Sequence, residues 1–122
     1  MRHKEQIKLS KKCIAAVSQK DEKTVKRELF KSEEILTLLR AYDHFADVNG
    51  EIDDFTIIRV NFGKSNTSFS IDVEYIVTYY FGCDDLNQTR DEEMEIQIDI
   101  DPRTDEAILT GENEEKREPD VF

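Results

Sequence analysis

Residues 93–101 constrain the fold of this chain more than any other segment, because their side chains alternate strictly between apolar and polar. Successive side chains of a β-strand point to opposite faces of the sheet. The alternation therefore predicts a strand with one buried face and one face in water. The apolar positions are Met94, Ile96, Ile98 and Ile100, and the polar positions are Glu93, Glu95, Gln97, Asp99 and Asp101.

Three more segments after Gly50 show strand patterns. Residues 54–62 place Ile58, Val60 and Phe62 on one face, and residues 67–81 carry an apolar side chain at every odd position from Phe69 to Phe81. A short fourth strand is expected at 106–110, after the turn that Pro102 favours. Residues 82–92 are expected to form an acidic loop. The short connections predict a four-stranded antiparallel meander.

The chain before Gly50 shows helical spacing instead. Within residues 4–19, Ile7, Cys13, Ile14 and Val17 fall on one helical face. Ser and Asp residues at 18–21 favour a break, since both are good N-caps. A second stripe of apolar residues at helical spacing crosses 21–46, and Ser32, Glu33 and Glu34 form a good helix start within it. Whether 21–46 forms one helix or two stays open.

The predicted fold is α+β, with two or three N-terminal helices packed on one face of the four-stranded antiparallel β-meander. Residues 1–110 form a single α+β domain, and residues 111–122 form a flexible acidic C-terminal tail. Cys13 and Cys83 lack metal or redox spacing, and no stretch is apolar enough for a membrane span or a signal peptide. A cytoplasmic protein without membrane association is expected.

The net charge of −11 is distributed unevenly along the chain. Residues 1–31 hold ten Lys/Arg and four Asp/Glu, a net of +6, whereas residues 32–122 hold seven and twenty-four, a net of −17. Such asymmetry indicates the sign of a binding partner.

Motifs for chemistry fail when they are tested residue by residue. Asp47–Asp53 resembles the middle of an EF-hand loop. Placing Gly50 at the sixth position, however, puts Phe45 first, where an oxygen ligand is required, and Thr56 twelfth, where a bidentate acid is required. His3 and His44 have no cysteine or second histidine at zinc-ligand spacing. We expect no enzyme activity, no catalytic residues, no metal site and no cofactor.

An acidic face on the sheet is the candidate site. The outward positions of 67–81 and 93–101 share one face if the two strands are neighbours, and the 82–92 loop adds acids at the rim. Ile76 and Tyr80 lie outward too, and aromatic groups beside charge are typical of interface anchors. The predicted partner-binding residues are Asp72, Glu74, Tyr80, Asp84, Asp85, Glu93, Glu95, Asp99 and Asp101.

A small acidic inhibitor that docks this face on a basic surface of a larger protein is the leading hypothesis. Anti-restriction, anti-CRISPR and toxin-immunity proteins form such a class, and their targets include nucleic-acid-binding enzymes and toxins. In the extreme form, the carboxylates mimic nucleic-acid phosphates and occupy the DNA- or RNA-binding channel of the target. The protein itself is not expected to bind nucleic acid directly. Solubility alone is the plainer explanation of the acids.

Two other hypotheses stay open. The first is a ligand-binding or catalytic domain with an apolar pocket between helices and sheet, lined by Phe69, Tyr75, Tyr79 and Phe81. The second is a homodimer or larger homo-oligomer that pairs its exposed strand face with itself.

The last residues, Glu118-Pro119-Asp120-Val121-Phe122, end in an acidic and apolar tip with a terminal phenylalanine. This tip resembles the C-terminal tip of bacterial single-stranded-DNA-binding proteins, although it lacks their run of aspartates. The resemblance covers about five residues. It implies a role for Phe122 in partner binding.

Overall fold

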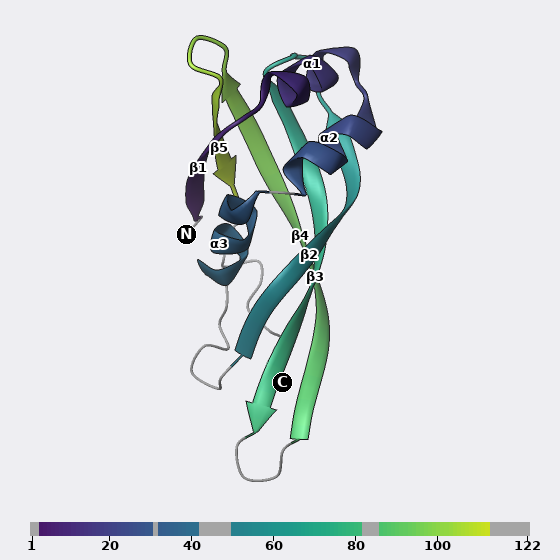
Figure 1. The fold of residues 1–122 in the computed structure, drawn as a ribbon, viewed down its shortest axis with the longest axis vertical. Coiled ribbons are helices and arrows are strands. Elements are labelled where there is room, and N and C mark those ends of the chain that lie inside the picture. The colour runs from purple at the N-terminus through teal and green to yellow at the C-terminus, as the bar shows by residue number, and fades with distance from the viewer. Residues whose placement is uncertain (1–2, 31, 42–49, 82–85, 113–122) are drawn as a thin grey trace.

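The computed structural model describes residues 3–30, 32–41, 50–81 and 86–112. Within them it contains three helices and five strands, which confirms the α+β class (Figure 1). In chain order these are β1 (Lys4–Lys8), α1 (Lys11–Gln19), α2 (Glu22–Leu29), α3 (Glu33–Ala41), β2 (Gly50–Phe62), β3 (Ser68–Phe81), β4 (Leu86–Asp101) and β5 (Glu106–Thr110).

The strands form one antiparallel sheet in the order β1-β5-β4-β3-β2. β2 to β5 follow one another as the meander that the sequence predicts, and β1 is added at the far edge beside β5. The sheet thus has five strands rather than the predicted four. In Figure 1, β3 and β4 continue as a twisted ribbon beyond the three helices.

The prediction of a helix over residues 4–19 is wrong for its first part. Lys4–Lys8 is a strand, and Ile7 pairs with Ala107 of β5. Ile7 and Leu9 are both buried, and their spacing of two residues is that of a strand. The helix begins only after Ser10, whose hydroxyl accepts the Cys13 N–H at 3.1 Å.

The predicted break near residues 18–21 is confirmed. Lys20 has a left-handed backbone (φ 55°), which ends α1, and the Asp21 carboxylate then caps α2 by accepting the Thr24 N–H at 3.3 Å. Over the described residues, 21–46 contains two helices, and the second begins directly after Ser32, as predicted. Residues 42–46 lie outside the described part of the chain.

β2 begins at Gly50, earlier than predicted, and its register with β3 shifts twice, between Ile52 and Phe55 and between Ile57 and Arg59. Such bulges reverse the facing of later side chains. Ile58 is consequently exposed, so the prediction that it shares an apolar face with Val60 is wrong.

β4 is also longer than predicted. Residues 86–92, expected to lie in an acidic loop, form the first part of β4 and pair with β3 in an unbroken register from Phe81↔Leu86 to Ser68↔Asp99. The remaining loop residues, 82–85, are outside the described residues. Residues 86–92 are mostly polar, but they can form a strand because they pair with the apolar strand β3.

The core lies between the sheet and the helices. At the centre of the sheet it includes the odd residues of β3 from Phe69 to Val77 and the even residues of β4 from Met94 to Ile100, and buried residues of the other strands and the helices complete it. These faces are as predicted. α3 contacts both β1 and β2, which lie at opposite edges, so the sheet curls around this helix. Its buried residues are Ile35, Leu38 and Leu39.

The end of the described chain still contacts the sheet. The Gly111 N–H donates to the His3 carbonyl at 3.0 Å, and the Glu112 carboxylate accepts the Glu95 N–H at 3.0 Å. Residues 113–122, which contain most of the predicted tail and its Phe122 tip, lie outside the described residues. None of the helices in the described ranges is long and apolar enough to cross a membrane.

Candidate functional site: the acidic outer face

The outer face is defined here as the side of β3 and β4 that points away from the helices. Its centre holds two pairs of acids that lie directly opposite one another, Asp72 with Glu95 and Glu74 with Glu93. Glu74, Glu93 and Glu95 are exposed, and Asp72 is partly exposed. Opposite residues on neighbouring strands have Cβ atoms about 5 Å apart, so the structure brings these four predicted residues together.

A cation from the edge strand partly balances this cluster. Arg59 of β2 donates from Nη1 to Asp72 Oδ2 at 2.9 Å, and Asn61 donates to the same oxygen at 3.2 Å. The Arg59 side chain is 65% exposed. An exposed ion pair of this kind is screened by water and salt. The outer face thus remains negative around Glu74 and Glu95.

Asp99 and Asp101 lie farther along β4 and have local partners. Asp99 accepts the Ser68 hydroxyl at 2.9 Å. Asp101 accepts the Arg103 backbone N–H at 3.0 Å, and this hydrogen bond lowers the pKa of its carboxyl, with a further contribution from the Arg103 side chain. Asp101 therefore organises the turn before β5, and Asp99 marks the margin of the acidic cluster.

The apolar group of the outer face is Ile76, which is 49% exposed and lies opposite Asp91. Its outward position agrees with the sequence pattern. Tyr80 belongs to β3 by its backbone, but its side chain is outside the described part of the structure, as are Asp84 and Asp85. The predicted interface is therefore described only around Asp72, Glu74, Ile76, Glu93 and Glu95.

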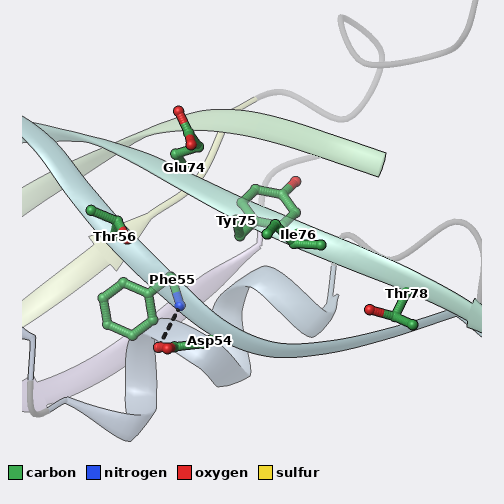
Figure 2. A pocket seen from close by; sticks show the side chains of 7 residues that line it. All are labelled: Asp54, Phe55, Thr56, Glu74, Tyr75, Ile76 and Thr78. Carbon is green, nitrogen blue, oxygen red and sulfur yellow. Dashed lines mark hydrogen bonds between the residues drawn. The ribbon is translucent and has the colours of Figure 1, made fainter. Parts of the chain in front are cut away.

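A hollow between β2 and β3, with a volume of about 300 Å³, is a feature that the sequence analysis missed. It lies at the register shift between Ile52 and Phe55, where the two strands depart from regular pairing. In Figure 2 the carboxylates of Asp54 and Glu74 point in different directions, and Asp54 accepts the Phe55 N–H at 2.8 Å. Its lining is Asp54, Phe55, Thr56, Glu74, Tyr75, Ile76 and Thr78.

This hollow differs from the apolar pocket that the second hypothesis requires. Phe69 is 2% exposed and packs in the core, away from the hollow. Tyr75 lines the hollow, but it is only 4% exposed and most of its side chain packs in the core. The side chains of Tyr79 and Phe81 are outside the described residues. The adjacent acids Asp53 and Asp54 interrupt the strand pattern of β2 and were the available signal for the irregularity.

A second, smaller cavity of about 210 Å³ lies where β1, α1 and α2 meet and includes Cys13. Burial raises the pKa of the Cys13 thiol to about 11, and the Glu28 carboxylate adds to the shift. Since the thiolate is the nucleophile, this cysteine is a poor one at neutral pH. Ser10 donates its hydroxyl to Glu28 at 2.9 Å while it caps α1, which is a structural role.

Among the residues that the structure describes, no group of three or more His, Cys, Asp or Glu side chains is arranged to hold a metal ion. Over its described side chains, the outer face thus combines fixed negative charge with the exposed apolar group of Ile76. Comparison with protein-family models, with curated proteins and with solved structures finds no match for this chain.

Proposed function

We propose that this protein is a small acidic binding protein that docks its outer face on a basic surface of a larger protein. The supporting observation is the arrangement of Asp72 opposite Glu95 and of Glu74 opposite Glu93 on a face that no described helix covers. Like charges placed directly opposite one another destabilise a sheet. A positive partner surface would turn this unfavourable arrangement into a favourable one.

The class of partner follows from this charge pattern. Basic surfaces are typical of proteins that bind nucleic acids, because those surfaces neutralise phosphates. A row of carboxylates on a rigid sheet could occupy such a surface and exclude the nucleic acid. We therefore assign the protein to a cytosolic inhibitory role, with a nucleic-acid-binding enzyme or toxin as its target and with no chemistry of its own.

A charge-reversal experiment tests this function. Glu74→Lys combined with Glu95→Lys should weaken binding to the partner at least tenfold, and the wild-type complex should dissociate as salt is raised. The control, Glu33→Lys with Glu34→Lys, makes the same change of net charge at the start of α3. The partner is obtained by affinity capture from the native host with elution in high salt. Equal affinity of the two double variants would disprove docking through the outer face.

Self-association through the same face is the competing role. Ile76 is sufficiently exposed to contribute to a dimer, but two copies would bring Glu74 and Glu95 against their own counterparts. Light scattering over a range of protein concentrations separates the two roles. A mass that rises with concentration, and does so more strongly in high salt, would favour the homo-oligomer.

A further inference from the structure

The hollow between β2 and β3 opens beside the acidic cluster of the outer face. Glu74 and Ile76 belong both to that face and to the lining of the hollow. The volume of about 300 Å³ lies at the lower end of the roughly 300–1,000 Å³ that is usual for small-molecule pockets. A space of this size suits one long side chain of a docked protein. The chemistry of its walls decides which side chain fits.

The hollow exists because the ladder between β2 and β3 is interrupted. One more residue of β2 than of β3 lies between the pairs Ile52↔Val77 and Phe55↔Tyr75. An extra residue of this kind stays out of the interstrand pairing and bends its strand. The Asp54 carboxylate accepts the Phe55 N–H at 2.8 Å and so stabilises the irregular backbone. The hollow is therefore formed before a partner binds.

Part of the lining is apolar and firmly held. Phe55 and Tyr75 are buried, and the Phe55 ring packs against the Phe30 ring with centroids 6.0 Å apart. Ile76 lies next to Tyr75 in β3 and is exposed. The methylene groups of a long cationic side chain can cover this exposed surface while the charge stays near water. Because the walls are already ordered, little conformational entropy is lost on binding.

The remaining lining is acidic and polar. Asp54 comes from β2 and Glu74 from β3, so each of the two strands that border the hollow supplies a carboxylate (Figure 2). Among the described residues, Asp54 accepts only the Phe55 N–H, and Glu74 has no hydrogen bond or ion pair. Thr56 and Thr78 add hydroxyl groups. Carboxylate oxygens without a donor favour a ligand that has a positive charge and several N–H groups.

From this lining we infer that the hollow receives an arginine side chain of the basic partner. Its methylene groups lie along Ile76, and its guanidinium is attracted by the carboxylates of Asp54 and Glu74. The inference rests on the proposed function and specifies the residue that anchors the partner. Arginine fits better than lysine, because the guanidinium has five N–H donors and is less strongly hydrated. Attraction between charges is also stronger in a partly enclosed space than on an open surface.

Three peptides that differ in one side chain test the assignment on the full chain. They are acetyl-Gly-Arg-Gly-amide and its counterparts with citrulline or lysine in the middle. Citrulline has nearly the shape of arginine but no charge. In an NMR titration, the arginine peptide should bind about tenfold or more tightly than the citrulline peptide, with the lysine peptide in between. The largest shifts should fall on the amide signals of Phe55, Ile76 and Thr78.

Three results of this titration would overturn the inference. The first is equal affinity of the arginine and citrulline peptides, and the second is tighter binding of the lysine peptide. The third is an arginine peptide that does not bind in low salt.

A neutral substitution in the hollow tests the role of its charge. Asp54→Asn removes one charge and keeps an oxygen that can accept the Phe55 N–H. Asp105→Asn makes the same change of net charge in the turn before β5, where its left-handed backbone (φ 61°) suits asparagine. Asp54→Asn should weaken binding of the arginine peptide about fivefold, whereas Asp105→Asn should change it by less than about twofold. Equal effects would mean that the peptide responds only to the overall charge, which contradicts the inference.

The apolar wall is tested at constant charge. Ile76→Ala removes the surface along which the methylene groups lie and should weaken binding of the arginine peptide about threefold or more. Ile108→Ala removes the same atoms from another exposed isoleucine, on β5, and should leave the affinity unchanged. Circular dichroism and thermal unfolding verify that the variants are folded. If a variant of the hollow unfolds the protein, the arginine and citrulline peptides decide the question on the wild-type chain.

The captured partner distinguishes the hollow from docking through the outer face in general. Suppose that Glu74→Lys with Glu95→Lys weakens binding of this partner and that Asp54→Asn does not. That result would overturn the arginine site and leave the proposed function standing. A partner that responds to none of these variants would contradict both.

NMR spectra of the isolated protein identify any other occupant of the hollow. Deletion of residues 113–122 should leave the signals of Phe55 and Ile76 unchanged, and so should dilution. A change on deletion would assign the hollow to the C-terminal residues of this chain, and a change on dilution would assign it to a second copy. Either result would overturn the inference.

Discussion

Arg59 of β2 donates from its guanidinium to the Asp72 carboxylate of β3 at 2.9 Å, on the outer face of the sheet. On its other side, Asp72 lies opposite Glu95 of β4. One carboxylate is thus held between a cation and an anion, and Arg59 compensates only the half of the cluster nearest β2. The acids of the outer face should therefore differ in their effects on stability.

Glu95→Gln and Glu74→Gln should each raise the free energy of unfolding. Both substitutions remove a charge that faces a like charge across the strands, which is a contribution of about 0.2–1 kcal/mol. Asp72→Asn is the matched comparison, because it also removes a negative charge but loses the charged partner of Arg59. It should leave stability unchanged or lower it.

Urea unfolding at low and at high salt measures these effects. The gain from Glu95→Gln and Glu74→Gln should shrink in high salt, since screening already weakens the repulsion in the wild type. Equal effects of all three substitutions would mean that the cross-strand pairs do not interact as their positions suggest.

Glu22→Ala should destabilise the protein and expose the edge of β2. The Val60 N–H would lose the carboxylate that it contacts at 3.0 Å, and an unsatisfied, partly buried N–H costs about 1–3 kcal/mol. Glu22→Gln is the control, because its amide oxygen can still accept this hydrogen bond. The free energy of unfolding should be lower for the alanine variant than for the glutamine variant, and light scattering should detect aggregation in the alanine variant alone. Equal stability of the two variants would show that the Val60 contact does not protect the edge.

The thiol of Cys13 should make stability depend on pH in the alkaline range. Burial raises its pKa to about 11 in the folded protein, whereas an unfolded cysteine ionises near pH ~8.5. The folded state therefore retains the proton longer, and stability should fall as pH rises from about 8.5 to 11, at up to ~1.4 kcal/mol per pH unit. Below that window the thiol is protonated in both states and has no effect.

A comparison in a Cys83→Ser background isolates this thiol from the other groups that titrate above pH 8. Cys13→Ala should remove its share of the alkaline loss of stability. In the same background, alkylation of Cys13 by iodoacetamide at pH 8 should be slow until denaturant is added, because the side chain is 1% exposed. Rapid alkylation of the native protein would contradict the burial of this side chain.

The parts of the fold that sequence predicts are those in which one pattern spans a whole element. The alternation from Met94 to Ile100 identified the strand, its buried face and its exposed acids, because burial on one side of a sheet enforces a period of two. The break at Asp21 was predictable for a similarly local reason, whereas the sequence left open whether 21–46 forms one helix or two. The Asp21 carboxylate caps α2, so capping chemistry decides this boundary.

The errors lie where a distant part of the chain decides the structure. Lys4–Lys8 is a strand because β5, a hundred residues later, offers an edge to pair with. Its own sequence is too short and too polar to specify this. Ile58 is exposed because a bulge shifts the register beside Arg59, and residues 86–92 are a strand because β3 lies beside them. In the candidate site, the acidic pairs followed from local alternation, whereas the hollow beside Phe55 depends on a register shift between β2 and β3.

The corrected first strand leads to a direct test of the fold. Ile7 of β1 is 4% exposed and Ile108 of β5 is 38% exposed, although their strands are neighbours. Ile7→Ala should lower the free energy of unfolding by about 2–5 kcal/mol, the usual cost of truncating a buried isoleucine. Ile108→Ala removes the same atoms from an exposed position and should cost about 1 kcal/mol or less. Urea unfolding measures both, and equal losses would contradict the assignment of Ile7 to the buried face of β1.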